Sequence, residues 1–392
     1  MPASNTASSY GTVTKVFHWV TALLILTVIP LGLIAEDLPF DAPLKVQLFS
    51  IHKTLGIIIF VVALGRILWA LTQTKPGDLH PDRRVETMVA HIVHWLLYIS
   101  LVAVPLTGWL HHAATAGFAP ILLPIGQDLP FVPKSEGIAA VFAGLHWLWS
   151  KVMIVSILLH FVGALKHHLI DKDATLRRMM FKDAVLPETS PRHSGFAAPI
   201  IAVAIYAVAA AGAAATGVLS ENVGGPTATL EAVASDWTVT DGAVAITITQ
   251  LGNPVAGQFD DWTAAISFDP EATGVMGHVT ATIAIGSLHL GSVSGQAMGE
   301  DFFAAETFPT ATFDADITAD GTTYVANGTL TVKGIAVPVS LPFVLQLNGD
   351  TATMAGSLLL DRRDFQVGQS MADATNLGFD VAVTINLSAT RS

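Results

Sequence analysis

The sequence predicts an all-α transmembrane bundle of four helices, a fifth helix that acts as a tether, and an all-β antiparallel barrel at the C-terminal side. Three observations lead to this fold class: long apolar segments in the first half, alternating apolar and polar residues in the second, and a change of charge between them. Of the 392 residues, 52% are hydrophobic and only 13% are charged, whereas soluble domains contain about 25% charged residues. We therefore expect at least part of the chain to lie in a membrane.

The two halves of the chain differ in charge. Residues 1–195 contain 15 Lys and Arg against 12 Asp and Glu, and residues 196–392 contain 4 against 19. The acidic second half repels phosphate, which excludes nucleic acid as its partner. The chain has no cysteine, so disulfides, iron–sulfur clusters and thiolate zinc sites are excluded as well. Histidine, with 14 copies, is the leading metal ligand.

Five apolar segments are long enough to cross a bilayer, for which about 20 helical residues are needed. They cover residues 17–35, 52–72, 89–111, 138–165 and 197–219. The first has no cleavage pattern, so we expect a retained signal anchor. Lys and Arg gather before the first segment, between the second and third, and between the fourth and fifth. This distribution predicts a multi-pass plasma-membrane protein with a cytoplasmic N-terminus and an exported C-terminal half.

The fifth segment differs from the other four. It is rich in Ala and Gly, lacks His and follows the polar stretch FKDAVLPETSPRHSG. It is most simply a tether and export signal, although its small residues also suit packing against a neighbouring helix. We expect three regions: a bundle over 10–185, a linker with the fifth helix over 186–231, and a barrel over 232–392. No internal repeat is evident.

From about residue 232 the hydrophobic period changes to two. In AVAITITQL, Val244, Ile246 and Ile248 alternate with small or polar residues, and FDVAVTINL near the C-terminus follows the same pattern. Turn sequences such as TADG and LNGD separate these runs. Short strands at regular spacing predict a β-sandwich or barrel.

The stretch LHWLWSKVMIVSILLHF places His146 and His160 fourteen residues apart. In an α-helix this spacing is about 40° short of four turns and about 21 Å long, so both rings lie on one face at two depths. His18 and His52 lie on other segments at the matching depths. A b-type haem iron takes two axial ligands from facing helices. The four histidines therefore predict two haem b groups in a four-helix bundle.

The third segment offers an alternative set of ligands. It contains His91, His94, His111 and His112, and His94 and His112 are five helical turns apart. Spacing alone thus leaves the third helix open as a ligand helix. Any one intramembrane histidine is also as readily an interfacial hydrogen-bonding residue.

Several motifs of the first half resemble the bacterial cytochrome b-561 family over residues 10–185. They are FHW near the start, IHKTLG, AHIVHWLLYISLVAVPLTGWL and the ending LLHFVGALKHHLIDKDATLRRMM. The resemblance implies a four-helix bundle of the bacterial inner membrane, with two haem b groups that exchange electrons with quinone or quinol. A bound quinone is a candidate second cofactor.

The resemblance also implies roles for individual residues. His18 and His160 would ligate the inner haem iron, and His52 and His146 the outer one. His94 matches a family histidine that is not an axial ligand. One interpretation is that it contacts quinone or a haem propionate. The other is that it is an interfacial histidine.

Two cations lie within the second apolar segment. Arg66 is a candidate to pair with an inner-haem propionate, and Lys53, beside His52, to contact the outer haem or to attract an anionic reactant. The alternative for both is a side chain that snorkels to the membrane interface.

Motifs of the second half resemble the YceI-like family over residues 232–390. They are GQFDDWTAAISFDPE, GEDFFAAETFPTATFDADI, GTLTVKGIAVPVSLPF and LLLDRRDFQVG. The resemblance implies a lipocalin-like barrel whose interior holds an isoprenoid lipid such as a quinone tail; a plain filled core is the alternative. The first strands, DGAVAITITQLGNPVAGQF, lack the His-Ser pair and further His usual in the family, so the ligand stays open. We expect Asp361, Arg362, Arg363 and Asp364 to form a salt-bridge cluster.

The sequence thus predicts a membrane electron-transfer protein with quinone as redox partner and a periplasmic lipid-binding barrel. One alternative is a membrane-anchored lipid-binding or stress-response module with a secondary redox role. Another is a superoxide:quinone oxidoreductase, although few cations lie on the outer side beyond Lys45, Lys53 and Lys134. The direction of electron flow and the oligomeric state are not fixed by the sequence.

Overall fold

The structure, a computed structural model, describes residues 2–38, 42–115, 119–181, 187–191, 195–219, 228–231, 233–321 and 323–391. The chain divides into two compact units, one of residues 1–114 and 120–221 and one of residues 115–119 and 222–392. Parts of the linker expected at 186–231 lie outside the described residues, so its boundaries stay a prediction. The two units are described separately.

Five helices in the first unit are long and apolar enough to cross a membrane, which confirms the five predicted segments. They are α1 Thr12–Asp37, α2 Pro43–Leu71, α3 Arg84–Ala114, α4 Glu136–Leu169 and α5 Ala197–Ala215, and a 3₁₀ turn, η1 Arg177–Met179, follows α4.

Most of these helices extend beyond the predicted segments. The helix α2 begins at Pro43, a residue suited to the first helical turn, and its opening turns contain the polar residues Lys45 and Gln47. A segment predicted from a run of apolar residues does not include such polar helical turns. His18 and His52, which lie at the beginning of the first two predicted segments, therefore lie inside their helices rather than in the first turn.

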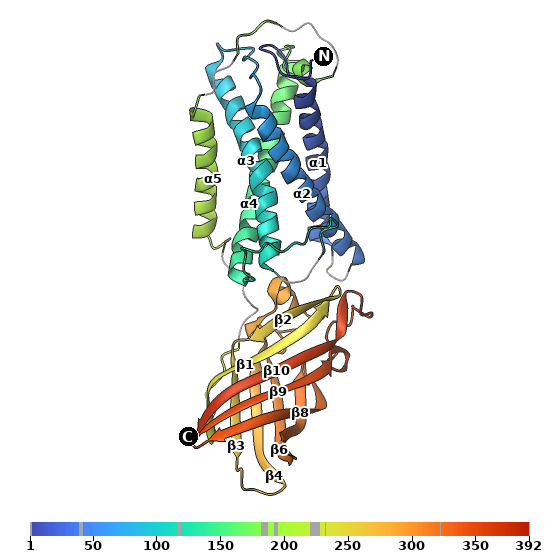
Figure 1. The fold of residues 1–392 in the computed structure, drawn as a ribbon, viewed down its shortest axis with the longest axis vertical. Helices are drawn as coiled ribbons and strands as arrows, with labels where there is room; N and C mark the ends of the chain where they lie inside the picture. Colours follow the sequence, from blue (N-terminus) through green and yellow to red (C-terminus); the bar gives the residue numbers. More distant parts are fainter. Residues whose placement is uncertain are drawn as a thin grey trace. The chain divides into compact units, whose positions relative to one another are not determined.

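The helices α1 and α2 pack together, as do α3 and α4, and α2 contacts α3 (Figure 1). A buried apolar cluster joins the first three helices through Ile25 and Val28 of α1, Ile59 of α2 and Leu101 of α3. This cluster fixes the depth at which the facing residues of these helices meet.

The helix α5 packs against α3 and also contacts α4. Its Tyr206 hydroxyl lies 2.5 Å from Ser100 Oγ and donates to the carbonyl oxygen of Leu96 at 3.3 Å. Ala202, on the same face, is fully buried, so the backbones approach closely as small residues permit. The small residues of this tether therefore do pack against a neighbouring helix.

The second unit contains one antiparallel sheet of ten strands, in the order β3-β4-β6-β7-β8-β9-β10-β1-β2-β5. This confirms the predicted antiparallel barrel architecture. The strands are β1 Trp237–Gln250, β2 Asn253–Phe259, β3 Trp262–Phe268, β4 Val275–Ala284, β5 Leu288–His289, β6 Thr310–Asp320, β7 Thr323–Val332, β8 Ile335–Asn348, β9 Thr351–Asp361 and β10 Leu377–Arg391. Short helical pieces, η2 Ile285–Ser287, η3 Gly291–Val293, α6 Ser294–Ala297 and η4 Arg362–Phe365, lie between strands.

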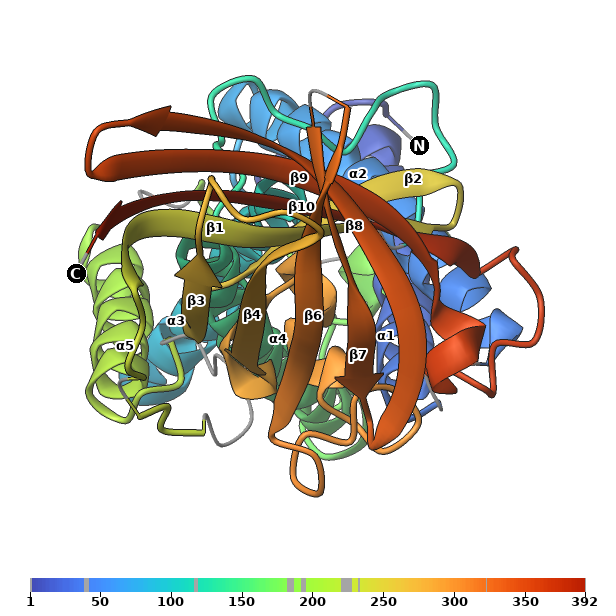
Figure 2. The same cartoon turned by 90° about the horizontal axis from the view of Figure 1, so that it is seen from below.

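The sheet curls until the start of β1 meets β3 (Figure 2). The backbone N–H of Asp236 donates to the carbonyl oxygen of Ile266 at 3.0 Å, and the Trp237 indole N–H donates to that of Phe268 at 3.2 Å. Strands β1 and β10 pair Val244 with Ile385 and Ile246 with Val383. This register directs the alternating apolar residues to one face, as period-two strands require.

The LDRRDF motif is only partly the predicted salt-bridge cluster. Arg363 pairs with Asp361 on the surface, whereas Arg362 is 4% exposed and binds backbone instead. Its guanidinium donates to the carbonyl oxygens of five residues at 2.6–3.1 Å, namely Val367, Gly368, Met371, Leu377 and Gly378. Arg362 thus fixes the loop between β9 and β10.

We predict that Arg362→Met lowers the free energy of unfolding of the barrel by about 3 kcal/mol or more, because buried carbonyl groups lose their donor. Arg363→Met is the matched control, since an exposed ion pair contributes less than about 1 kcal/mol. Hydrogen exchange of strands β9 and β10, recorded during urea unfolding of the full-length protein in detergent, measures the effect of both variants. Equal effects of the two variants would contradict this role of Arg362.

Candidate functional site: two histidine pairs

The structure brings four of the predicted site residues together as two pairs. His18 of α1 faces His160 of α4, with ring centres 6.1 Å apart. His52 of α2 faces His146 of α4, with ring centres 6.2 Å apart. We refer to these pairs as the His18 level and the His52 level. The helix α4 contributes one histidine to each.

The ring separation tests whether each pair fits a metal held between two imidazoles. A ligating imidazole nitrogen lies about 2 Å from its metal and about 1 Å from its own ring centre, so two axial rings are about 6 Å apart. Both pairs meet this requirement. His94 of α3 also approaches His160, but at 5.1 Å with the rings perpendicular, which is about 1 Å too close for an ion between them.

The two histidines of the His52 level are oriented by backbone carbonyl groups. His52 Nδ1 lies 2.9 Å from the carbonyl oxygen of Val28, and His146 Nδ1 lies 2.9 Å from that of Val104. A ring that donates its Nδ1–H to a carbonyl keeps Nε2 unprotonated and available as a metal ligand. Both rings therefore present the nitrogen that a haem iron binds.

Two glycines make room for these rings. A Cβ added at Gly32 would lie 2.7 Å from His52 Cε1, and one added at Gly108 would lie 3.0 Å from His146 Cε1. Real Cβ atoms essentially never approach another atom below 3.0 Å. The absence of a side chain at Gly32 and Gly108 lets the helices α1 and α3 approach the histidines closely.

These contacts show an internal repeat that the sequence analysis missed. His18, Val28 and Gly32 of α1 recur 76 positions later in α3, as His94, Val104 and Gly108. On α2 and α4, His52 recurs 94 positions later as His146, and Arg66 has His160 as its counterpart. The dipeptide His-Trp, at 18–19, 94–95 and 146–147, was the available signal. The substitution at Arg66 accounts for α2 having one paired histidine where α4 has two.

The remaining predicted residues lie near the two levels. Arg66 has its guanidinium carbon 5.2 Å from the centre of the Tyr98 ring and is an electrostatic neighbour of His18 and His160. Lys53 is 7% exposed and is an electrostatic neighbour of His52 and of His112. Tyr98 was not anticipated, because nothing in the sequence relates α2 to α3 at this depth.

Two of the α3 histidines, His94 and His111, contact backbone carbonyl groups, whereas His91 Nε2 lies 3.0 Å from Asp78 Oδ1. His94 Nδ1 lies 2.6 Å from the carbonyl oxygen of Ala90 in its own helix. His111 Nδ1 lies 2.9 Å from that of Ala139 in α4. The separation of His94 from His160 and these contacts favour the two pairs above over α3 as the source of axial ligands.

Comparison with known proteins agrees with this architecture. Residues 9–182 match the family described as prokaryotic cytochrome b561, and residues 234–389 match the YceI-like domain. The chain is 34% identical over 186 residues to cytochrome b561 homolog 2 of Escherichia coli (strain K12), covering 47% of this chain and 97% of that protein. It is 28% identical over 171 residues to the probable superoxide oxidase CybB of Yersinia pestis, covering 42% and 92%.

Solved structures match the second unit. The crystal structure of Burkholderia cenocepacia BcnA is 34% identical, covers 38% of this chain and 96% of its own, and has a TM-score of 0.36. The Campylobacter jejuni YceI protein is 22% identical, with 35% and 84% coverage and a TM-score of 0.31. The chain therefore belongs to the prokaryotic cytochrome b561 family and has a YceI-like domain fused to its C-terminal side.

Proposed function

We propose that this protein is a dihaem membrane cytochrome in which His18 and His160 ligate one haem b iron and His52 and His146 the other. The family implies b-type haem binding. The observation that supports two sites is the pair of ring separations, 6.1 and 6.2 Å. When bound, the haem groups supply one-electron exchange between ferrous and ferric iron. The protein holds, orients and separates them.

The helix α4 sets the distance between the two levels. His146 and His160 are fourteen residues apart, which corresponds to about 21 Å along the helix axis. A bilayer core is about 30 Å thick, so the two levels span much of its depth. Because both ligands belong to one continuous helix, this separation does not vary with the loops.

Quinone or quinol is the proposed redox partner. The distribution of Lys and Arg supports a cytoplasmic N-terminus. In the proposed orientation the His18 level lies on the cytoplasmic side, and the barrel is periplasmic. At the His18 level, His94 has no place as an axial ligand and is available to contact quinone. Arg66 lies close enough to act on a propionate there, and its intramembrane charge needs such an anionic partner.

The interior of the barrel supports an isoprenoid ligand. A cavity of about 170 Å³ is lined by apolar side chains, among them Trp237, Trp262, Ala264, Phe313 and Phe343. Packed protein cores rarely leave voids much larger than a water molecule, which favours a ligand chamber over a filled core. Since the lining carries no polar group for a head group, the lipid tail would enter and its polar end stay at the mouth.

One relative favours a second candidate function. The chain resembles a protein named probable superoxide oxidase, and Lys53 places a buried cation beside His52. In such a reaction two superoxide ions each lose one electron and form dioxygen, while one quinone takes up two electrons and two protons. Measuring quinone reduction by superoxide in the purified protein distinguishes this activity from quinol oxidation.

Replacing His52 or His146 with Ala should remove one haem and leave the other, because the iron at the His52 level then loses one of its two proposed histidine ligands. The haem-to-protein ratio of the detergent-purified protein should fall by half. His94→Ala should keep the full ratio. A lost haem in His94→Ala with full occupancy in His52→Ala would assign the ligands to α3 instead.

Gly32→Ala should disturb the haem at the His52 level, since the added methyl group displaces the His52 ring. Overpacking of this kind costs about 1–3 kcal/mol, so haem affinity should fall about tenfold. Gly56→Ala is the matched control, because its Cβ would meet nothing within 4 Å. Haem-transfer kinetics to apomyoglobin measure both, and equal haem loss from the two variants would count against the arrangement.

Ala264→Phe should block the binding of an isoprenoid quinone to the barrel, because the new ring fills the cavity that Ala264 lines. Ala265→Phe is the control, since successive residues of a strand point to opposite faces. Lipid extraction and mass spectrometry of the purified proteins should find isoprenoid lipid in the native chain and Ala265→Phe only. Equal lipid content in all three would place the lipid elsewhere.

A further inference from the structure

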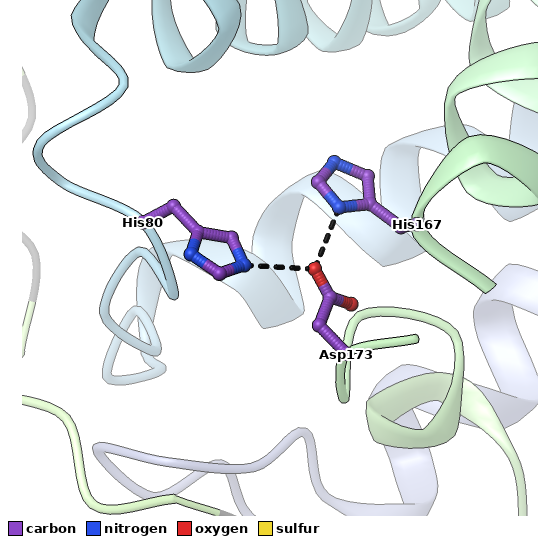
Figure 3. Close-up of side chains that lie close together, drawn as sticks. All are labelled: His80, His167 and Asp173. Carbon is purple, nitrogen blue, oxygen red and sulfur yellow. Dashed lines mark hydrogen bonds and ion pairs between the residues drawn. The ribbon is translucent and has the colours of Figure 1, made fainter. Parts of the chain in front are cut away.

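A cluster of three metal-ligating side chains lies outside both histidine levels (Figure 3). His80 belongs to the connection between α2 and α3, His167 to the last turn of α4, and Asp173 to the segment after α4. Asp173 Oδ2 lies 3.0 Å from His80 Nε2 and 2.7 Å from His167 Nδ1. The two imidazole rings are stacked, with an interplanar angle of 6°.

We propose that His80 Nε2, His167 Nδ1 and the Asp173 carboxylate form a binding site for a divalent transition-metal ion. Their three ligand atoms lie within 4.8 Å of one another. Two stretches of the chain that are distant in sequence, one at residue 80 and one at residues 167–173, thus direct ligand atoms to one point. This site is independent of the haem ligands and of the proposed function.

The charges around the cluster leave one carboxylate for a cation. Glu86 and Asp171 both pair with Lys166, at 2.5 and 2.8 Å, and Asp171 also pairs with Arg83. Asp171 Oδ2 lies 3.2 Å from His167 Nδ1 as well, but two cations already share the charge of this carboxylate. Among the residues that the structure describes, the ion-pair partners of Asp173 are the two imidazoles. Partial burial would raise the pKa of Asp173, but hydrogen bonds from Thr175, His167 and His80 lower it to about 2. Asp173 is therefore an anionic ligand at neutral pH.

The other ring nitrogen of His167 has a partner suited to a metal ligand. His167 Nε2 lies 3.4 Å from Glu86 Oε1. Histidines that bind metals usually donate their second ring N–H to a carboxylate, which fixes the tautomer. Without a metal, a neutral imidazole has one N–H to share between the carboxylates on its two sides. These are the two states that an experiment must separate.

The ligand set indicates the kind of metal. Two imidazoles and one carboxylate suit Zn²⁺, Fe²⁺, Ni²⁺ or Cu²⁺, whereas Mg²⁺ and Ca²⁺ prefer oxygen ligands alone. His167 follows His160 by seven residues, about two turns or 10 Å along α4. A bound ion would therefore join the α2–α3 connection to the end of α4 near the His18 level.

Zn²⁺ titration of the haem-loaded, detergent-purified full-length protein tests the proposal by calorimetry. We expect one site per chain, weakened more than tenfold in His80→Ala and in Asp173→Asn. Glu86→Gln should weaken it about tenfold through the orientation of His167. His168→Ala, an exposed neighbour outside the cluster, is the control and should bind Zn²⁺ like the native chain. Co²⁺ in place of Zn²⁺ should give a visible absorption that His80→Ala loses.

Absence of Zn²⁺ binding, or equal affinity in the native chain and His80→Ala, would overturn the proposal. The cluster would then be a hydrogen-bonded network without a metal. The haem content of each variant reports whether the bundle is folded, so a failure here is distinguishable from a failure of the haem assignment.

Discussion

The bundle depends on how imidazole is accommodated in a hydrocarbon environment. A polar ring in an apolar interior is costly unless each nitrogen has a partner. At the His52 level, the carbonyl oxygens of Val28 and Val104 accept from Nδ1. That leaves Nε2 for a metal. The glycines one turn further along, Gly32 and Gly108, let the neighbouring helix come close enough for this contact. The same contacts therefore determine how the rings are oriented, how closely the helices approach and which ring nitrogen is available to a metal.

The same constraint explains the organisation of the first unit as two related helix pairs. Each pair offers a histidine, a carbonyl group and a glycine at equivalent positions, but the two pairs differ at Arg66 and His160. Because of this change, α4 contributes a histidine to both levels, and in the proposed assignment His94 is not a haem ligand. This asymmetry leaves a cation, Arg66, and a histidine, His94, beside the His18 level. These are the groups expected where an electron carrier exchanges electrons and protons.

Local sequence patterns were sufficient to predict much of the fold and part of the candidate site. Helix length and strand alternation are short-range properties, so the five helices and the antiparallel barrel were predictable, and the helical period relates His146 to His160. Contacts between helices are not local. The fit of Gly32 against His52 depends on the crossing of two helices, and the cluster around Asp173 on the course of two loops. The carbonyl groups around Arg362 carry no side-chain signal, so a surface ion pair was expected there.

The central claim is that one chain holds two b-type haem groups, one at each histidine level. The most direct test is the haem-to-protein ratio of the detergent-purified native protein, measured together with a reduced-minus-oxidised spectrum during a potentiometric titration. We expect two haem b per chain that titrate as two components. A single haem per chain would contradict the assignment of one level, and a chain purified without haem under haem-replete expression would contradict both.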